Sequence, residues 1–261
     1  MEVHHHTHHP KKWTEYFWEF FMLFLAVFCG YLAEYQLEHK IERDRVKKYM
    51  HDMVENLKYD IERINRNTPR NKEVKIDCDS LRNEIKKAID GQINHSKLYY
   101  YYYKKPGSGL VTFNRAAITQ LKNSGQLRLV KNDSLLKKIL DYYERLIYAT
   151  DVFRDLEGKE LENLVQISNE IFSTTSLKFL DTISDTISPF GAIDFKNDLP
   201  KILNNKELKL LSSDKITLEK FHNSLLSFEL ALVNYNRFLY YSRTSAKDLI
   251  IQINKEYHFE D

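Results

Sequence analysis

Residues 218–253 read LEKFHNSLLSFELALVNYNRFLYYSRTSAKDLIIQI, and no other part of the chain is as regularly patterned. One set of positions recurs at alternating steps of three and four over about five heptads. We call these positions the seam: they are Leu218, Phe221, Leu225, Phe228, Leu232, Tyr235, Leu239, Ser242, Ala246, Leu249 and Ile253. The seam predicts a helix of about 60 Å, with Asp214 as its N-cap, packed with a left-handed twist against other helices.

Composition also favours helices. The chain has only seven glycines and five prolines among 261 residues, too few for a turn-dense β or glycine-loop architecture. Apolar residues make up 43%, enough for a core. The net charge of +2 provides no field that would attract nucleic acid, so none is expected as a partner. Cys29 and Cys78 are too differently placed to predict a disulfide.

Helical periodicity extends over earlier segments as well. Apolar residues at helical spacing in 50–64 predict that the N-terminal membrane helix described below continues into the bundle and ends at about Asn67, before Pro69. A second helix is expected from Cys78 through Ala88, running into the tyrosines at 99–103. Residues 104–109 then form a break.

The centre of the chain predicts shorter pieces and one long helix. A short helix fits residues 113–123, with Gly125 as its stop. A long helix with Asp133 as N-cap reaches Phe172, with a kink near Gly158. Residues 173–191 are predicted to be a loop, and a short helix is predicted over 200–211.

These elements predict an all-α protein. Four long helices would form an elongated antiparallel bundle, with the short helices in its crossover connections. The expected division is a histidine-rich tail at 1–12, a transmembrane anchor at 13–36 and a helical bundle at 37–261 outside the membrane.

The anchor is predicted from residues 20–33, which are all apolar or Tyr. The run is shorter than the about 20 residues that span a bilayer, and extending it takes in Glu19 and Glu34. Aromatic residues flank it as interfacial belts do: Trp13, Tyr16, Phe17, Trp18, Tyr31 and Tyr35. A charged helix over 34–48 follows without a cleavage site, so the segment is expected to stay attached.

One face of the anchor is a candidate contact with a partner. Glu19 either snorkels to the interface or pairs with the helix of another subunit. Ala26, Gly30 and Ala33, spaced by four and three, form a smooth stripe on which a second helix can pack.

Two stretches resemble a family of uncharacterised single-pass membrane proteins of Bacteroidetes-type bacteria. The first is residues 19–30, EFFMLFLAVFCG, with the linker that ends at Tyr49. The second is residues 117–133, AITQLKNSGQLRLVKND, followed by LDYY at 140–143. The resemblance implies a helical protein of the cell envelope with an ordinary N-in signal anchor, and it implies no activity.

The orientation follows from conflicting signals. Lys11 and Lys12 precede the span, whereas a larger basic group follows it: Lys40, Arg43, Arg45, Lys47 and Lys48. That count favours a cytoplasmic bundle. Large domains translocate despite such charge, however, and the resemblance implies an N-in anchor. We therefore expect an inner-membrane protein with a periplasmic bundle.

Motifs for catalysis or cofactor binding are not found in the sequence. The chain has neither a phosphate-binding loop nor a paired-histidine zinc motif, so we expect no enzyme, cofactor or metal centre. The tail contains His4, His5, His6, His8 and His9. These imidazoles form either a metal-binding cluster or, as we expect, a polar pH-sensitive tail.

Five consecutive tyrosines form a second candidate surface: Tyr99, Tyr100, Tyr101, Tyr102 and Tyr103. Five adjacent rings cannot all face one core, and tyrosine is enriched at interfaces. The alternatives are packing at one end of the bundle, a contact with a partner, and stacking on a glycan or single-stranded nucleic acid.

The expected function is that of a membrane-anchored structural or interaction protein, a subunit of a homo-oligomer or of a larger envelope assembly. Its partners would be the lipid bilayer and itself or other membrane proteins. The alternative is a sensor or transducer whose bundle binds a ligand and shifts the membrane helix.

Overall fold

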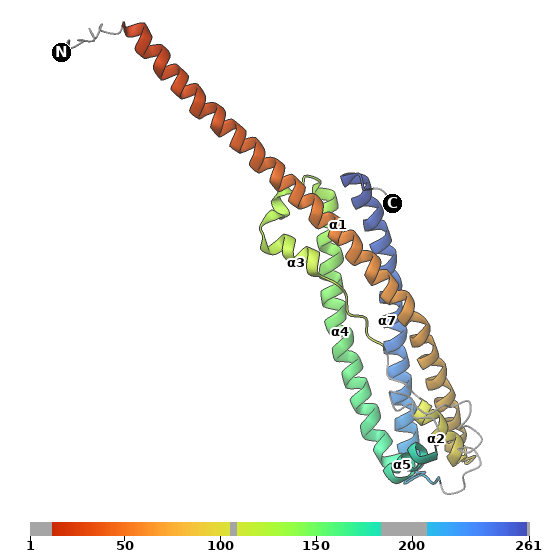
Figure 1. Cartoon of the computed structure of the whole chain (residues 1–261). Coiled ribbons are helices and arrows are strands. Elements are labelled where there is room, and N and C mark those ends of the chain that lie inside the picture. Colours follow the sequence, from red (N-terminus) through yellow and green to blue (C-terminus); the bar gives the residue numbers. More distant parts are fainter. Residues whose placement is uncertain (1–11, 105–108, 184–207, 260–261) are drawn as a thin grey trace, which may run out of the picture.

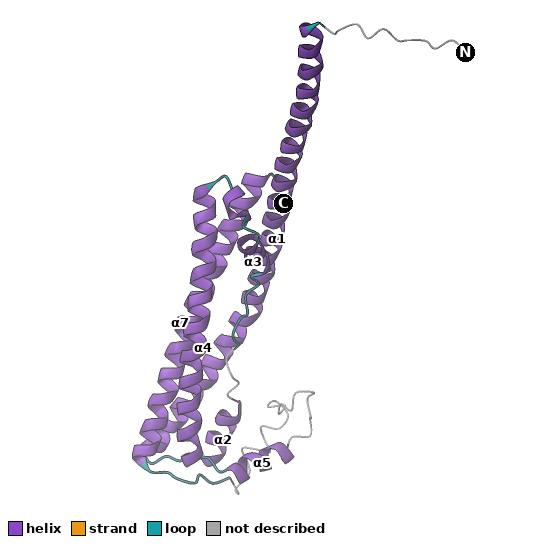
Figure 2. Cartoon of the chain, turned by 90° about the vertical axis from the view of Figure 1, so that its left-hand side faces the viewer, coloured by secondary structure: helices purple, strands orange, loops and turns teal. Residues whose placement is uncertain are grey.

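The computed structural model describes residues 12–104, 109–183 and 208–259, and within these ranges every regular element is a helix. Figure 1 shows their arrangement, and Figure 2 shows the helices from another side. The elements are α1 (Trp13–Ile89), α2 (His95–Lys104), α3 (Ala116–Asn123), the 3₁₀-helix η1 (Gln126–Leu129), α4 (Asp133–Ile171), α5 (Thr174–Ile183) and α7 (Lys215–Tyr257). The prediction of an all-α protein is confirmed.

Helix α7 is the central rod of an elongated bundle. It packs along both α1 and α4 and runs antiparallel to them, while α2 and α3 pack on α1 (Figure 1). Three long helices, rather than four, lie in the described part of the chain, because the two helices expected on either side of Pro69 are one. The short helix α3 lies in the connection between α1 and α4, as predicted. The prediction that the second helix runs into the tyrosines at 99–103 is wrong: α1 ends at Ile89, and a turn with Gly91 at φ 86° separates it from α2. Helix α5 lies in the connection between α4 and α7.

The predicted end of the first helix at Pro69 is wrong. Helix α1 is 77 residues long and passes through Pro69, although proline lacks an N–H and crowds the preceding turn. Side chains support that turn: Thr68 Oγ1 donates to the Ile64 carbonyl at 2.8 Å, and Asn67 Nδ2 donates to the Arg63 carbonyl at 2.9 Å. Both figures show that α1 changes direction along its length, as helices with an internal proline do.

Packing on α7 explains why α1 continues. The apolar face of α1 is buried on both sides of the proline, through Leu57 and Ile64 before it and Val74, Cys78 and Leu81 after it. A buried aliphatic side chain contributes about 1.5–3 kcal/mol. A few such residues offset the about 3 kcal/mol that an internal proline costs.

The bundle has two apolar cores along its length. The proximal core, next to the exposed N-terminal part of α1, joins residues 46–64 of α1 to α3, the start of α4 and the C-terminal half of α7. The distal core joins residues 74–88 of α1 to α2, the end of α4 and the N-terminal half of α7. All eleven positions of the predicted α7 seam are buried, so the periodicity identified the packed face correctly.

Helix ends follow local capping, with one correction. Asp214 caps α7 by accepting from the Thr217 N–H at 2.9 Å, and Gly125 adopts φ 68° after α3, both as predicted. The N-cap of α4 is Asn132, not Asp133: its Oδ1 accepts from the Leu135 N–H at 3.0 Å. Helix α4 is continuous through Gly158.

Two predicted connections differ from the structure. The loop predicted over 173–191 contains α5, because its apolar residues at 177, 180 and 183 recur at helical spacing; residues 184–191 lie outside the described ranges. In the short helix predicted over 200–211, residues 208–211 are not helical and the remainder lies outside the described ranges. There the backbone bonds to α4 instead, since the Leu211 N–H donates to the Ile171 carbonyl at 2.8 Å.

Candidate functional site

The first part of α1 projects away from the bundle (Figures 1 and 2). The first buried residue of α1 is Val46, and the helix before it contains a stretch that is long and apolar enough to cross a membrane. This stretch is not buried against the protein: towards the start of α1, Trp13 is 82% exposed and Val27 is 74% exposed. An apolar surface of this extent is unusual in contact with water and marks an interaction surface.

The predicted partner-contact residues share one face of this exposed helix. Glu19, Ala26 and Ala33 are seven residues apart, which returns to almost the same side of a helix, and Gly30 lies beside them. All four are exposed, and a side chain added at Gly30 would meet nothing within 4 Å. The structure therefore leaves this face open to lipid or to another helix.

The tyrosines at 99–103 organise the distal end of the bundle. Tyr99 is fully buried and the next four are half-buried. The hydroxyl of Tyr99 donates to the Lys209 carbonyl at 2.9 Å and accepts from the Ser173 N–H at 2.7 Å. One side chain on α2 thus joins the end of α4 to the segment that leads into α7.

Tyr102 adds a second link at the same place. Its ring stacks on Phe172 with centroids 4.1 Å apart, and its hydroxyl lies 2.9 Å from Ser168 Oγ. Lys104, at the end of α2, donates to Asp77 Oδ1 on α1 at 2.6 Å. These contacts show that Tyr99 and Tyr102 pack at the end of the bundle, and the rings of Tyr100, Tyr101 and Tyr103 are partly exposed.

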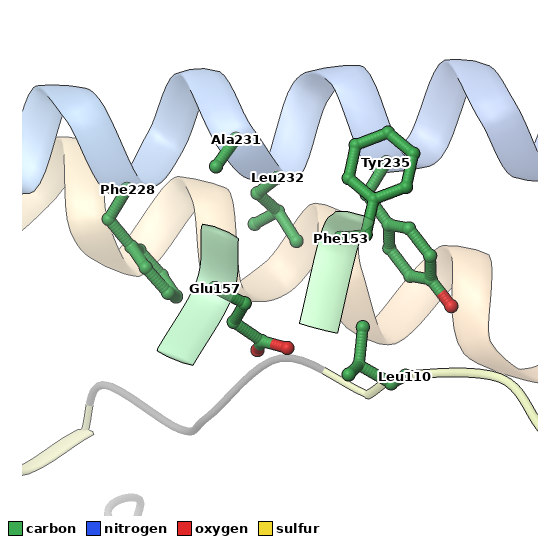
Figure 3. Close-up of a pocket in the computed structure, with 7 residues that line it drawn as sticks. All are labelled: Leu110, Phe153, Glu157, Phe228, Ala231, Leu232 and Tyr235. Carbon is green, nitrogen blue, oxygen red and sulfur yellow. The ribbon is translucent and has the colours of Figure 1, made fainter. Parts of the chain in front are cut away.

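The space between the two cores is nearly filled. Figure 3 shows a pocket between α4, α7 and the segment at Leu110, with Glu157 among apolar neighbours. Burial raises the pKa of Glu157. The cavity volume is about 10 Å³, room for about one water molecule. This pocket is too small for the ligand that the sensor hypothesis requires.

A charged cluster that sequence analysis missed joins α1 to α7. Arg82 Nε on α1 donates to Glu229 Oε1 on α7 at 3.2 Å, and Glu229 is buried. Arg82 also donates to Asp79 Oδ1 at 2.8 Å, and Lys75 donates to Asp79 Oδ2 at 2.6 Å. The sequence shows that Lys75 and Arg82 lie four and three residues from Asp79, within reach of it on one helix. It does not show that Glu229, 147 residues from Arg82, joins them.

The two carboxyl groups of this cluster have pKa values displaced in opposite directions. Burial, followed by the hydrogen bond and charge of Asp79, raises the pKa of Glu229 to about 7. Burial acts against ionisation of Asp79 too, but hydrogen bonds from Lys75 and Arg82 outweigh it and lower its pKa to about 2. Glu229 therefore holds a proton in mildly acidic solution while Asp79 is ionised.

A second buried acid lies in the proximal core. Asp60 is fully buried, and its Oδ1 accepts from the Asn114 N–H at 2.9 Å. Burial raises its pKa to about 6, although Asn114 and Arg63 act in the opposite direction. In the described part of the chain, Asp60 Oδ2 and the hydroxyls of Tyr142 and Tyr143 have no hydrogen-bond partner.

Two open clefts lie where the projecting part of α1 meets the bundle. One, of about 860 Å³, lies between residues 33–43 of α1 and residues 128–131. The other, of about 490 Å³, shares Lys40, Arg43, Leu129 and Lys131 with the first and extends to the end of α7. In the sequence, Lys40 and Arg43 bear only on membrane orientation, because no local pattern shows that η1 packs beside α1.

The histidine cluster of the tail, the one candidate metal-binding segment in the sequence, lies within residues 1–11, which are outside the described ranges. Over residues 12–104, 109–183 and 208–259, no three His, Cys, Asp or Glu side chains gather in a metal-binding arrangement.

Comparison of the chain with protein-family models, with curated proteins and with solved structures finds no significant match.

Proposed function

We propose that the protein is a membrane-anchored structural or interaction protein, a subunit of a homo-oligomer or of a larger assembly in the cell envelope. The observation that carries the proposal is the continuity of α1, in which one helix includes an exposed apolar segment and one rod of the bundle. A continuous helix holds the bundle at a set distance from the bilayer. Residues 37–45, an exposed stalk of about 14 Å, separate the span from the first buried residue.

The partner of the membrane helix, in this proposal, is a second copy of the same helix. The face with Ala26, Gly30 and Ala33 lets two backbones approach closely, and Glu19 on that face supplies a polar group that favours pairing in lipid. The half-buried tyrosines at the distal end are the second surface available for assembly.

The mass of the full-length protein in mild detergent tests this proposal. We expect an oligomer for the wild type and a shift towards monomer for Gly30→Leu, because the larger side chain separates the helices. Val27→Leu lies on another face and serves as the matched control. A strictly monomeric wild type without bound partners would overturn the proposal.

The proposed location is a bacterial inner membrane, with the bundle in the periplasm. Cysteine labelling in intact cells tests the orientation, because Cys78 is buried and Cys29 lies in the apolar segment. Ser213→Cys places a thiol at an exposed distal position. A membrane-impermeant maleimide should label this variant before lysis if the bundle is periplasmic. Labelling only after lysis would place the bundle in the cytoplasm.

A transducer is the second candidate function. The observation that favours it is again the unbroken α1, since a displacement of residues 46–89 is transmitted to the membrane helix. This hypothesis requires a small-molecule ligand that raises the unfolding temperature of the bundle. A screen of soluble metabolites in which no compound raises that temperature would count against it.

A further inference from the structure

The clefts beside α1 combine a basic lining with an apolar entrance. Ala33 and Leu37 lie at the end of the larger cleft nearest the apolar segment, and Arg128, Leu129 and Lys131 form the opposite wall. The packing of η1 on α1 brings this wall beside the helix. The cleft thus opens towards the side from which a bilayer would approach.

Positive charge in the clefts exceeds negative charge. The basic residues are Lys40, Arg43, Lys47, Arg128 and Lys131, and the acidic ones are Glu42, Asp44 and Glu256. Two of the three acids already have partners. Glu42 lies 3.4 Å from His39 Nδ1 and 3.8 Å from Arg128, and Glu256 accepts from Asn132 Nδ2 at 2.8 Å.

Three cations remain for a ligand. Among the residues that the structure describes, Lys40, Arg43 and Lys131 form no salt bridge, whereas Arg128 faces Glu42 and Lys47 lies over the Phe259 ring. Arg43 bonds only the His39 carbonyl, through Nε at 3.2 Å, which leaves the rest of its guanidinium free. Lysine and arginine donors around one cleft suit a phosphate group.

The position of the cleft along α1 matches the level of the lipid head groups. Lys40 is five residues beyond Tyr35, the last aromatic residue of the belt, which is about 7 Å along the helix, and Arg43 is about 12 Å along it. The interfacial layer of a bilayer is about 5–8 Å thick on each side, and unscreened attraction extends about 8 Å further.

We propose that this cleft binds the phosphate head group of an anionic phospholipid, with Lys40, Arg43 and Lys131 as its principal ligands. The inference rests on the proposed insertion of α1 into a membrane. The occupant is a lipid rather than a phosphate from solution because the cleft opens at Ala33 and Leu37, on the side of the acyl chains.

Nanodiscs containing the full chain test the proposal. In discs of phosphatidylcholine mixed with phosphatidylglycerol, native mass spectrometry should show that phosphatidylglycerol is retained preferentially over phosphatidylcholine. The triple variant Lys40→Gln, Arg43→Gln, Lys131→Gln should lower that preference roughly tenfold, and high salt should lower it as well. Lys159→Gln, Lys178→Gln, Lys220→Gln removes the same charge at exposed distal positions and should leave the preference unchanged.

Two outcomes would overturn the head-group site. Equal retention of both lipids by the wild type is one. The other is inorganic phosphate, added to phosphatidylcholine discs, raising the unfolding temperature as much as phosphatidylglycerol does. Alkaline extraction of membranes separates this failure from failure of the proposed function. Protein released by alkali contradicts membrane insertion, whereas retained protein without lipid preference contradicts only the site.

Discussion

Arg82 on α1 and Glu229 on α7 are 147 residues apart in sequence, and their Nε and Oε1 atoms are 3.2 Å apart across the distal core. The contact lies between two of the three long helices, and Asp79 completes it. A protonated Glu229 beside an ionised Asp79 makes the packing of these helices dependent on pH.

Between about pH 4.5 and 7, we expect the free energy of unfolding to fall as pH rises. The raised pKa of Glu229, about 7, means that the folded state keeps a proton that the unfolded state has released. The lowered pKa of Asp79, about 2, makes stability fall again as pH drops below about 3.8. Denaturant unfolding across this range checks both slopes.

Glu229→Gln tests the origin of the first slope. The amide cannot ionise, so the part of the decrease between pH 4.5 and 7 that Glu229 causes, on the order of 2 kcal/mol, should be lost, while the part caused by the raised pKa of Asp60 remains. Glu219→Gln changes an exposed acid on the same helix and should retain the slope of the wild type. An unchanged slope in Glu229→Gln would show that another group causes it.

Asp60→Asn should stabilise the protein at pH 8. The pKa of Asp60, about 6, shows that ionisation of this buried carboxyl is unfavourable in the folded state. The asparagine side chain keeps an oxygen for the Asn114 N–H and carries no charge, so a gain of about 2 kcal/mol is expected. The gain should vanish near pH 4. Asp155→Asn, on the exposed face of α4, is the control, and a loss of stability at pH 8 would contradict the prediction.

Tyr99→Phe should cost about 1–3 kcal/mol. The ring remains to fill the distal core, but the Lys209 carbonyl and the Ser173 N–H both lose their partner. Hydrogen exchange should show faster exchange at Ser173. Tyr148→Phe, which removes the hydroxyl of a side chain that is 73% exposed, should be nearly neutral. Equal effects of the two substitutions would exclude a specific role for the Tyr99 hydroxyl.

Pro69→Ala should raise the free energy of unfolding by about 1–3 kcal/mol, because alanine restores a backbone donor and is the better helix former. Thermal unfolding of the full chain measures the gain, and Lys72→Ala controls for the propensity of alanine at an exposed position nearby. A loss of stability would mean that the bend at Pro69 is needed for α1 to follow α7.

The helical class, the exposed apolar segment of α1 and the packed face of α7 were predictable because each depends on the order of residues within one helix. Apolar residues every three or four positions leave a helix with one face to bury, wherever its partner is. That property is local, and the structure confirms it at all eleven seam positions. The N-cap at Asp214 and the left-handed Gly125 are local for the same reason.

Contacts between distant residues account for what the sequence did not reveal. Local propensity ends a helix at Pro69, but burial of apolar side chains on both sides of it outweighs that cost. The hydroxyl partners of Tyr99, the pairing of Arg82 with Glu229 and the basic cleft beside η1 all join segments far apart in the chain. These contacts form only when the long helices pack together. That packing depends on the free energy of the whole bundle, so it cannot be read from one segment of sequence.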